Sequence, residues 1–274
     1  MAHRSPESRP TAEVPPEPRL TELMEEALTA PGRMSDTYSR FYEYSFGNQL
    51  WLRMQGAREP IASYKGWQKL GRQVVKGARA YYVLRPITVK SKSELDEDGK
   101  PKQYTRFKPV KGAFPYSMTE GETLPEVEPR EWSKERALGV LGINLVAYKS
   151  IDGNTQGHSY GNNVAINPMA TEPFPTLMHE MAHVVHGHTS PDELAEYATH
   201  RGIREFEAEG ASYLLCNELE VPFNREESRA YIQWWLRGDT PADTSIRKVF
   251  KAVDKILRAG YAPQEQEMGE GNVA

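Results

Sequence analysis

The sequence predicts an α+β protein in which a small basic α+β unit precedes a mostly helical unit with a small sheet. The chain has 274 residues, 38% of them hydrophobic, which is enough for a packed core and falls between one large domain and two ordinary ones. Residues 31–115 hold 17 Lys and Arg against 7 Asp and Glu, whereas the rest of the chain has a net charge of −14. Opposite charge in two parts of one chain indicates two units with different partners.

Several classes of protein are excluded at this level. The apolar runs are far shorter than the roughly 20 residues that span a bilayer, and the N-terminus lacks an apolar signal segment, so we expect a cytoplasmic protein without a membrane partner. The single cysteine, Cys216, cannot form an internal disulfide or a cysteine-rich zinc site. Any metal site must therefore be built from histidine and carboxylates.

The first unit is expected over residues 20–117, after a proline-rich disordered arm over residues 1–19. Apolar spacing predicts helices over residues 20–28, 35–54 and 63–70. β-Branched and aromatic residues predict a strand over Val74–Lys90 and a return strand over Tyr104–Val110, joined by a charged turn that contains Asp98 and Gly99.

An acidic linker is expected over residues 118–129, followed by the second unit over residues 130–261 and a flexible tail over residues 262–274. We expect a helix at residues 132–141, a strand at 143–148, a polar turn at 152–161 and an edge-like strand at Val164–Asn167. Further helices are predicted over residues 173–188, 191–200, 203–218, 224–237 and 242–259.

The most specific motif is HEMAH at residues 179–183, an HExxH pattern inside a helical segment. Residues four apart lie on one face of a helix, so the imidazoles of His179 and His183 can both reach one Zn²⁺ ion. Glu180 would then stand beside a water molecule at the metal and act as the catalytic base. The pattern predicts a zinc metalloendopeptidase, although a metal site without peptidase activity has the same spacing.

A catalytic zinc ion needs a third protein ligand, and the segment after the motif does not place a histidine where metzincins have theirs. We expect the ligand to be Glu205, which shares a helical stripe with Ala208, Glu209 and Ser212. Glu209 would bind the second nitrogen of a ligating histidine and so fix its orientation. Glu209 and Glu207 stay open as alternative ligands, Glu207 being the one expected to face solvent.

The remaining histidines have weaker assignments. His186 and His188 follow the motif, and His186 is expected to be a surface residue at the end of the motif helix, with an accessory ligand or transition-state donor as the alternative. We assign no role to His158 and His200. The strand at Val164–Asn167 could pair with an extended peptide, which makes amide-bond hydrolysis the natural reaction and a protein or peptide the substrate.

In the basic unit, cations alternate with aromatic residues. Cations follow phosphates and aromatic rings stack on unpaired bases, so this pattern predicts single-stranded nucleic-acid binding. The alternative is that Trp67 and the tyrosines belong to the core and the cations are merely solvated. The candidate nucleic-acid-binding residues are Asn48, Arg53, Lys65, Trp67, Lys69, Arg72, Lys76, Arg79 and Tyr81.

Several motifs occur together in this chain. They are FGNQLWL (Phe46–Leu52), Trp67 and LGRQVVKGARA (Leu70–Ala80), then FPTLMHEMAHVVHGH (Phe174–His188) and EFEAEGASYLLC (Glu205–Cys216). In this layout the chain resembles the ArdC-type antirestriction proteins of plasmids and phages. The resemblance implies an N-terminal domain that binds single-stranded DNA and a zincin domain similar to ImmA/IrrE metallopeptidases. It implies His179, His183 and Glu205 as metal ligands and Glu180 as the base.

The function expected from these observations is single-stranded-DNA binding combined with a zinc metallopeptidase-like site, in antirestriction or DNA protection. Two alternatives differ in class. One is a DNA-shielding module whose metal site is structural and not catalytic. The other is an ImmA-like peptidase that cleaves a repressor, with the basic unit in contact with protein.

Overall fold

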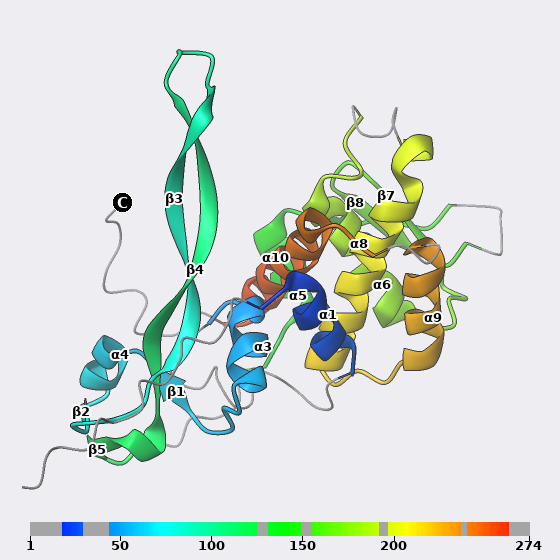
Figure 1. The fold of residues 1–274 in the computed structure, drawn as a ribbon. Coiled ribbons are helices and arrows are strands. Elements are labelled where there is room, and N and C mark those ends of the chain that lie inside the picture. Colours follow the sequence, from blue (N-terminus) through cyan, green and yellow to red (C-terminus); the bar gives the residue numbers. More distant parts are fainter. Residues whose placement is uncertain are drawn as a thin grey trace, which may run out of the picture.

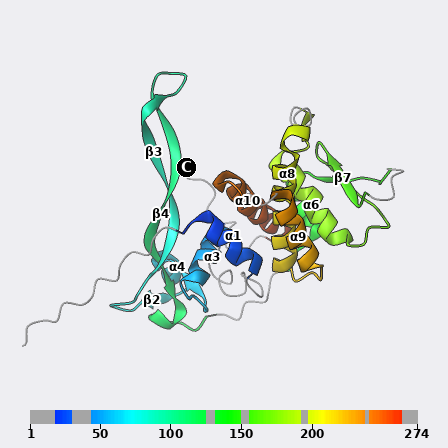
Figure 2. The same cartoon turned by 45° about the vertical axis from the view of Figure 1, so that its right-hand side comes forward.

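A computed structural model describes residues 18–29, 44–124, 131–149, 155–191, 197–236 and 240–262. A long β-hairpin stands apart from a group of helices, and helix α10 (Asp243–Gly260) lies between them (Figures 1 and 2). The mixed α+β class is thus confirmed. Within the described ranges, no helix combines the length and apolar character that crossing a membrane would need. The predicted arm, up to residue 17, and the predicted tail, from residue 263, lie outside these ranges.

The described residues of the first part include three short α-helices. Helix α1 (Leu20–Thr29) agrees with the prediction, and α3 (Phe46–Met54) is the described end of the second predicted helix, since residues 30–43 lie outside the described ranges. Helix α4 (Tyr64–Lys69) follows Ser63, whose hydroxyl accepts a 3.0 Å hydrogen bond from the Gly66 N–H. This side chain satisfies one of the free N–H groups that every helix has at its start.

The return strand of the hairpin is much longer than the predicted Tyr104–Val110, and the turn is correspondingly shorter. Strand β3 (Tyr81–Leu95) pairs antiparallel with β4 (Pro101–Pro115), and its turn uses Gly99 at φ 73°. The predicted start of the strand at Val74 is wrong, because that residue belongs to a separate short strand, β2 (Arg72–Val74). Three short elements complete this part: β1 (Ile61–Ala62), which pairs with β4, the 3-10 turn η1 (Tyr116–Met118), and β5 (Thr119–Gly121), which pairs with β2.

In the second part, the described residues form a three-stranded sheet beside five helices. Its elements are α5 (Lys134–Leu141), β6 (Asn144–Leu145), β7 (Gly157–Tyr160), β8 (Asn163–Ile166), α6 (Pro173–His186), α8 (Tyr197–Glu218), α9 (Arg225–Leu236) and α10. The polar turn predicted over residues 152–161 is wrong, because strand β7 lies in that segment. The prediction of an edge strand at Val164–Asn167 is also wrong, because β8 is the central strand, between parallel β6 and antiparallel β7.

One hydrophobic core joins the two parts. It contains Leu23 of α1 and Trp51 of α3 together with Met181 of α6 and Val253 of α10. Helix α10 contacts α1, α3, α5, α6 and α8, so it carries the core from one part to the other. The domain boundaries stay a prediction, but residues 119–121 of the expected linker form β5 and residues 125–130 lie outside the described ranges.

Candidate functional site

Helix α6 presents the HExxH motif on one face. Pro173 starts the helix, where its missing N–H costs nothing, and Gly187 ends it at φ 80°, a conformation that glycine adopts without strain. Leu177, Met178 and Met181 are buried and anchor the helix to the core. His179 and His183 are four residues apart, and their Nε2 atoms lie 3.1 Å from each other.

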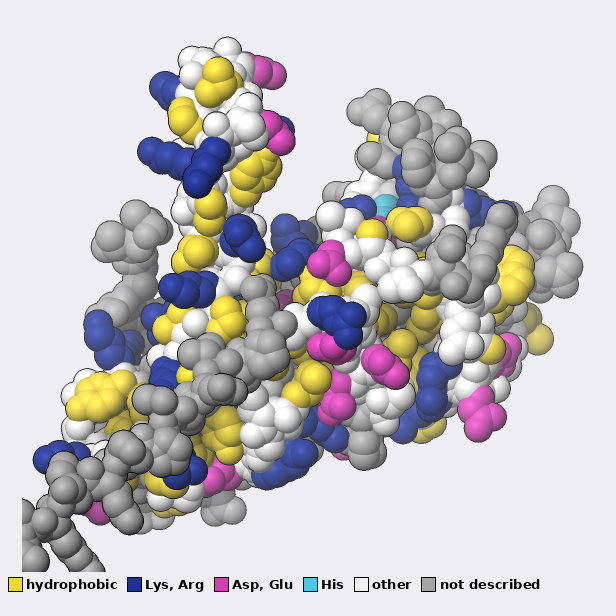
Figure 3. Space-filling view, in the orientation of Figure 1, with side chains coloured by type: hydrophobic (Ala, Val, Ile, Leu, Met, Phe, Trp, Pro, Cys, Tyr) yellow, Lys and Arg dark blue, Asp and Glu magenta, His cyan; other side chains and the backbone are white. Residues whose placement is uncertain are grey.

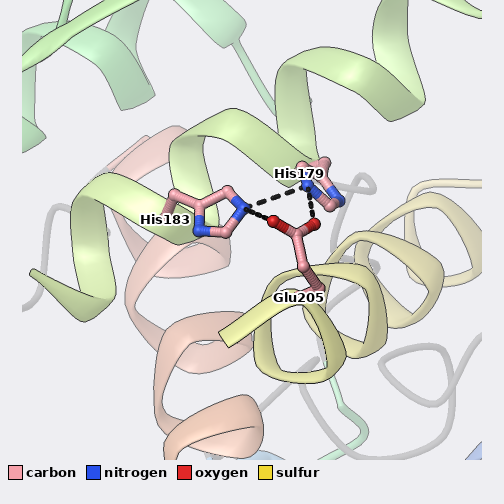
Figure 4. A group of neighbouring side chains, drawn as sticks. All are labelled: His179, His183 and Glu205. Carbon is pink, nitrogen blue, oxygen red and sulfur yellow. Dashed lines mark hydrogen bonds and ion pairs between the residues drawn. The ribbon is translucent and has the colours of Figure 1, made fainter. Parts of the chain in front are cut away.

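Helix α8 crosses α6 and brings a carboxylate to these imidazoles. Oε2 of Glu205 lies 3.4 Å from Nε2 of His179, and Oε1 lies 3.8 Å from Nε2 of His183 (Figure 4). The close approach is possible because Ala208 is small and Ser212 donates a 2.8 Å hydrogen bond to the Pro175 carbonyl at the start of α6. The structure therefore brings together the three residues expected to bind a metal.

These three side chains fit a tetrahedral metal ion. An ion about 2.0 to 2.1 Å from each donor, with tetrahedral angles, needs donors about 3.3 Å apart. The separations of 3.1, 3.4 and 3.8 Å bracket that value. Two imidazole nitrogens and one carboxylate leave a fourth position free, which is the donor set of catalytic zinc sites.

Glu209 lies behind His179, as the helical stripe predicts. Its Oε2 is 2.9 Å from Nδ1 of His179, and its Oε1 accepts a hydrogen bond from the hydroxyl of Ser228 in α9. Burial would lower the pKa of His179, but the carboxylates of Glu205 and Glu209 outweigh burial and raise that pKa to about 10. A metal cation must therefore displace a proton from His179, while Glu209 holds the ring in one orientation.

Glu180 is buried beside the metal-binding group and receives a hydrogen bond from the neighbouring sheet. The hydroxyl of Ser159 in β7 donates to Oε2 of Glu180 at 2.6 Å. An open cavity of about 920 Å³ borders His179, Glu180, His183 and Glu205, with β7 along its wall. A substrate in this cavity can reach both the metal-binding group and the carboxylate of Glu180.

The expectation that Glu207 faces solvent is wrong, and His188, which has no assignment from the sequence, is buried as well. Glu207 has no exposed surface because α10 covers the face of α8 that carries it. His188 is 4% exposed, and its ring lies between His183 and Glu207. With His186 they form a second group of potential ligands. Helical spacing predicts one buried face for a helix, whereas α8 is buried on two faces, one against α6 and one against α10. Spacing alone therefore could not identify Glu207 as buried.

The candidate nucleic-acid residues separate into two sets. The side chains of Lys65, Lys69, Lys76 and Arg79 are exposed around α4 and the segment after β2, and Tyr81 is half-buried at the base of the hairpin. The other candidates make internal contacts: Trp67 donates to the Phe114 carbonyl and is fully buried, Arg72 binds Thr119, Asn48 bonds both backbone groups of Leu84, and Arg53 lies 3.5 Å from Glu26. Burial of Trp67 and Arg72 removes them from any surface that could contact a ligand.

The hairpin carries a basic surface that is not among the candidate nucleic-acid-binding residues of the sequence. Arg85 lies directly opposite Lys108, and Arg106 is two residues further along the same face of β4. All three are exposed, and Figure 3 shows cationic side chains along the ribbon. We call Arg85, Arg106 and Lys108 the ribbon face. The two-residue spacing of Arg106 and Lys108 is the signal that could have found it, because residues two apart in a strand face the same side.

Comparisons with known proteins agree with the resemblance in the first part. Residues 23–114 match the family model described as the N-terminal domain of anti-restriction factor ArdC. Comparison with curated proteins gives no match. Two crystal structures of the antirestriction ArdC protein from the R388 plasmid, one metal-free and one Mn(II)-bound, each have 19% identity and a TM-score of 0.48, over 88% of this chain and 94% of the other. The family model confirms the ArdC-type resemblance: this chain carries an ArdC N-terminal domain at residues 23–114.

Proposed function

We propose that this chain is an antirestriction-type protein that binds single-stranded DNA and holds a catalytic zinc ion. The observation that carries the catalytic part is the convergence of His179, His183 and Glu205, with Glu180 beside them in an open cavity. The observation that carries the DNA part is the basic hairpin within the ArdC-like segment.

The residues of the site have separate tasks in peptide hydrolysis. A bound zinc ion would polarise the scissile carbonyl and lower the pKa of a water molecule. Glu180 would accept a proton from that water and deliver it to the leaving nitrogen. The 2.6 Å hydrogen bond from Ser159 holds the carboxylate of Glu180 in place, while Glu209 holds His179.

Strand β7 supports an extended peptide as the substrate. It pairs with β8 along one edge, and no described strand pairs with its other edge. Residues Gly157, His158 and Ser159 of this strand line the cavity. A peptide that adds to the free edge would pass the metal-binding group, so β7 takes the role that the sequence suggested for Val164–Asn167.

The catalytic part is tested by metal analysis and hydrolysis together. We expect purified protein to hold about one zinc ion per chain and His183→Ala to lose it. Glu180→Gln should keep the metal and lose hydrolysis of a labelled casein substrate. A chain that binds no zinc would overturn the metal site. Full DNA protection by Glu180→Gln would favour a shielding module with a structural metal instead.

The ribbon face supports the DNA part through its charge. Arg85 and Lys108 are directly opposite each other, and like charges at such positions destabilise a sheet. No ion pair with a carboxylate among the described residues compensates Arg85, Arg106 or Lys108. A phosphate backbone would supply the missing negative charge, and exposed Tyr104 on the same face offers a ring for stacking.

Binding of labelled oligo-dT over a range of salt concentrations tests this part. Arg106→Glu should weaken binding several-fold at low salt and reduce the slope of log K against log salt by about one. Arg225→Glu makes the same charge change on α9, away from the hairpin, and should have little effect. Equal losses in the two variants, or no binding by the wild-type protein, would contradict the proposal. In the second case a protein partner of the basic part becomes the better explanation.

A further inference from the structure

A chain of hydrogen bonds runs from His183 into the interior, on the side away from the metal-binding group. Nδ1 of His183 is 3.0 Å from Nδ1 of His188, and Nε2 of His188 is 3.0 Å from Oε2 of Glu207. Nζ of Lys248 in α10 donates to the same carboxylate oxygen at 3.2 Å. His183, His188 and Glu207 are 5%, 4% and 0% exposed, so most of their hydrogen-bonding capacity must be met within the protein.

We propose that His188 and Glu207 are positioning residues that fix the tautomer of His183 and thereby strengthen its hold on the metal. This inference rests on the zinc site proposed above. It concerns groups behind that site, none of which lies within the group formed by His179, His183 and Glu205.

Only one arrangement of protons satisfies the whole chain. Nε2 of His183 faces Glu205 and His179, and when this nitrogen binds the proposed zinc ion the hydrogen of the ring must be on Nδ1. Nδ1 of His188 must then accept that hydrogen bond, which places the hydrogen of His188 on Nε2. An ionised Glu207 is solely an acceptor, and it receives the Nε2–H. Glu207 thus dictates the state of His183 through His188.

The local backbone explains how His188 reaches this place. Gly187 turns the chain back at the end of α6, and the backbone N–H of His188 donates to the His183 carbonyl at 3.0 Å. The imidazole of His188 therefore lies against that of His183, with the ring centroids 5.2 Å apart. A glycine at position 187 and a histidine directly after it are what this geometry requires.

His188 also belongs to the second group of potential ligands, with His186 and Glu207. A second metal ion bound by this group is therefore the competing explanation for the buried contact between His188 and Glu207. The geometry disfavours it. The rings of His186 and His188 are stacked with 22° between their planes, so their nitrogen lone pairs lie in nearly parallel planes, which is unfavourable for binding one ion. Lys248 already neutralises Glu207. A metal on Nε2 of His188 would also move its hydrogen to Nδ1, where it would oppose the N–H of His183.

Three variants separate the explanations by their zinc affinity, measured in competition with a chromophoric chelator. His188→Phe keeps a ring but offers no acceptor, so we expect zinc to bind about 10- to 100-fold more weakly. His188→Asn can place its amide oxygen where Nδ1 was and should recover most of the affinity. His186→Phe, the matched control on the same turn, should bind zinc as the wild type does.

The tautomers provide a second readout that needs no variant. In zinc-loaded wild-type protein, nitrogen-15 NMR should find the hydrogen of His183 on Nδ1 and that of His188 on Nε2. Wild-type affinity in His188→Phe, or a hydrogen on Nδ1 of His188, would overturn the inference while leaving the zinc site standing. Two zinc ions per chain, with one lost in His186→Phe, would establish the second metal. No zinc in the wild type would instead remove the proposed function itself.

Discussion

Oδ1 of Asp254 in α10 accepts a 2.7 Å hydrogen bond from the backbone N–H of Phe46, the first residue of α3. Ser45 stands at the N-cap position but its side chain makes no capping bond. A carboxylate 208 residues away in sequence therefore caps α3 and also meets the positive end of its dipole. The bond ties the ArdC-like part to the last helix.

Removal of this cap should destabilise the whole protein. Asp254→Ala leaves the Phe46 N–H without its partner, and we expect the free energy of unfolding, measured by urea titration, to fall by about 1 to 2 kcal/mol. Asp254→Asn retains an acceptor, so its free energy of unfolding should fall by less. Asp98→Ala, in the exposed hairpin turn, should stay within about 0.5 kcal/mol of the wild type. A loss of similar size in Asp98→Ala would refute a specific role for Asp254.

Gly260 provides a second test of how α10 packs. A Cβ at this position would lie 2.0 Å from Nε1 of Trp132, whose indole donates to the Ile256 carbonyl. Gly260→Ala should therefore displace the indole and cost about 2 kcal/mol of unfolding free energy, visible in urea titration followed by tryptophan fluorescence. Gly139 in α5 has open space around it, so Gly139→Ala should be neutral or stabilise by up to about 1 kcal/mol. Similar unfolding free energies for the two variants would show that Trp132 does not pack as described.

His186 should make the metal-free protein sensitive to acid. Burial, together with the neighbouring His188, lowers the pKa of His186 to about 3. As the pH falls through about 6.5, the unfolded chain takes up a proton that the folded chain does not, so the free energy of unfolding decreases. Between pH 6 and pH 5, His186 lowers the free energy of unfolding by about 1 kcal/mol. Above about pH 7.5, His186 is neutral in both states and has no effect on the free energy of unfolding.

The measurement is urea unfolding in the presence of a chelator at several pH values. His186→Phe should show a shallower loss of stability below pH 6.5 than the wild type does. Comparison of the two proteins cancels the titration of the other histidines. Parallel pH curves for the two proteins would mean that His186 does not stay neutral in the folded state.

Cys216 offers a probe of global unfolding, since it is the single thiol and is fully buried in α8. Burial raises the pKa of this thiol to about 12. At pH 8 we expect a thiol reagent to react at least about 100-fold more slowly with native protein than with protein in urea. Rapid labelling of the native chain would show that α8 opens locally, which would also expose Glu205 and Glu207.

Local patterns of the sequence predicted much of the site, and long-range placement accounts for most of the errors. His179, Glu180 and His183 follow from helical spacing alone, and the stripe of Glu205, Ala208 and Glu209 faces α6 as expected. The position of β8 within its sheet depends on β7, a strand hidden in a segment rich in glycine and polar residues.

The burial of Glu207 depends on α10, which the spacing within α8 does not reveal. Trp67 illustrates the same limit in the basic part. A tryptophan among cations can either stack on a base or belong to the core. The hydrogen bond from Trp67 to the carbonyl of Phe114, 47 residues away in sequence, shows that it belongs to the core.

The shared core has a consequence for synthesis on the ribosome. Phe46 leaves the ribosome 208 residues before Asp254 does, which at about 5 to 20 residues per second is a delay of roughly 10 to 40 s. During that time Leu23 and Trp51 lack the helix that buries them in the finished protein. The nascent ArdC-like part thus presents apolar surface to chaperones until the final helix has emerged, and a message truncated before residue 243 should yield an aggregation-prone product.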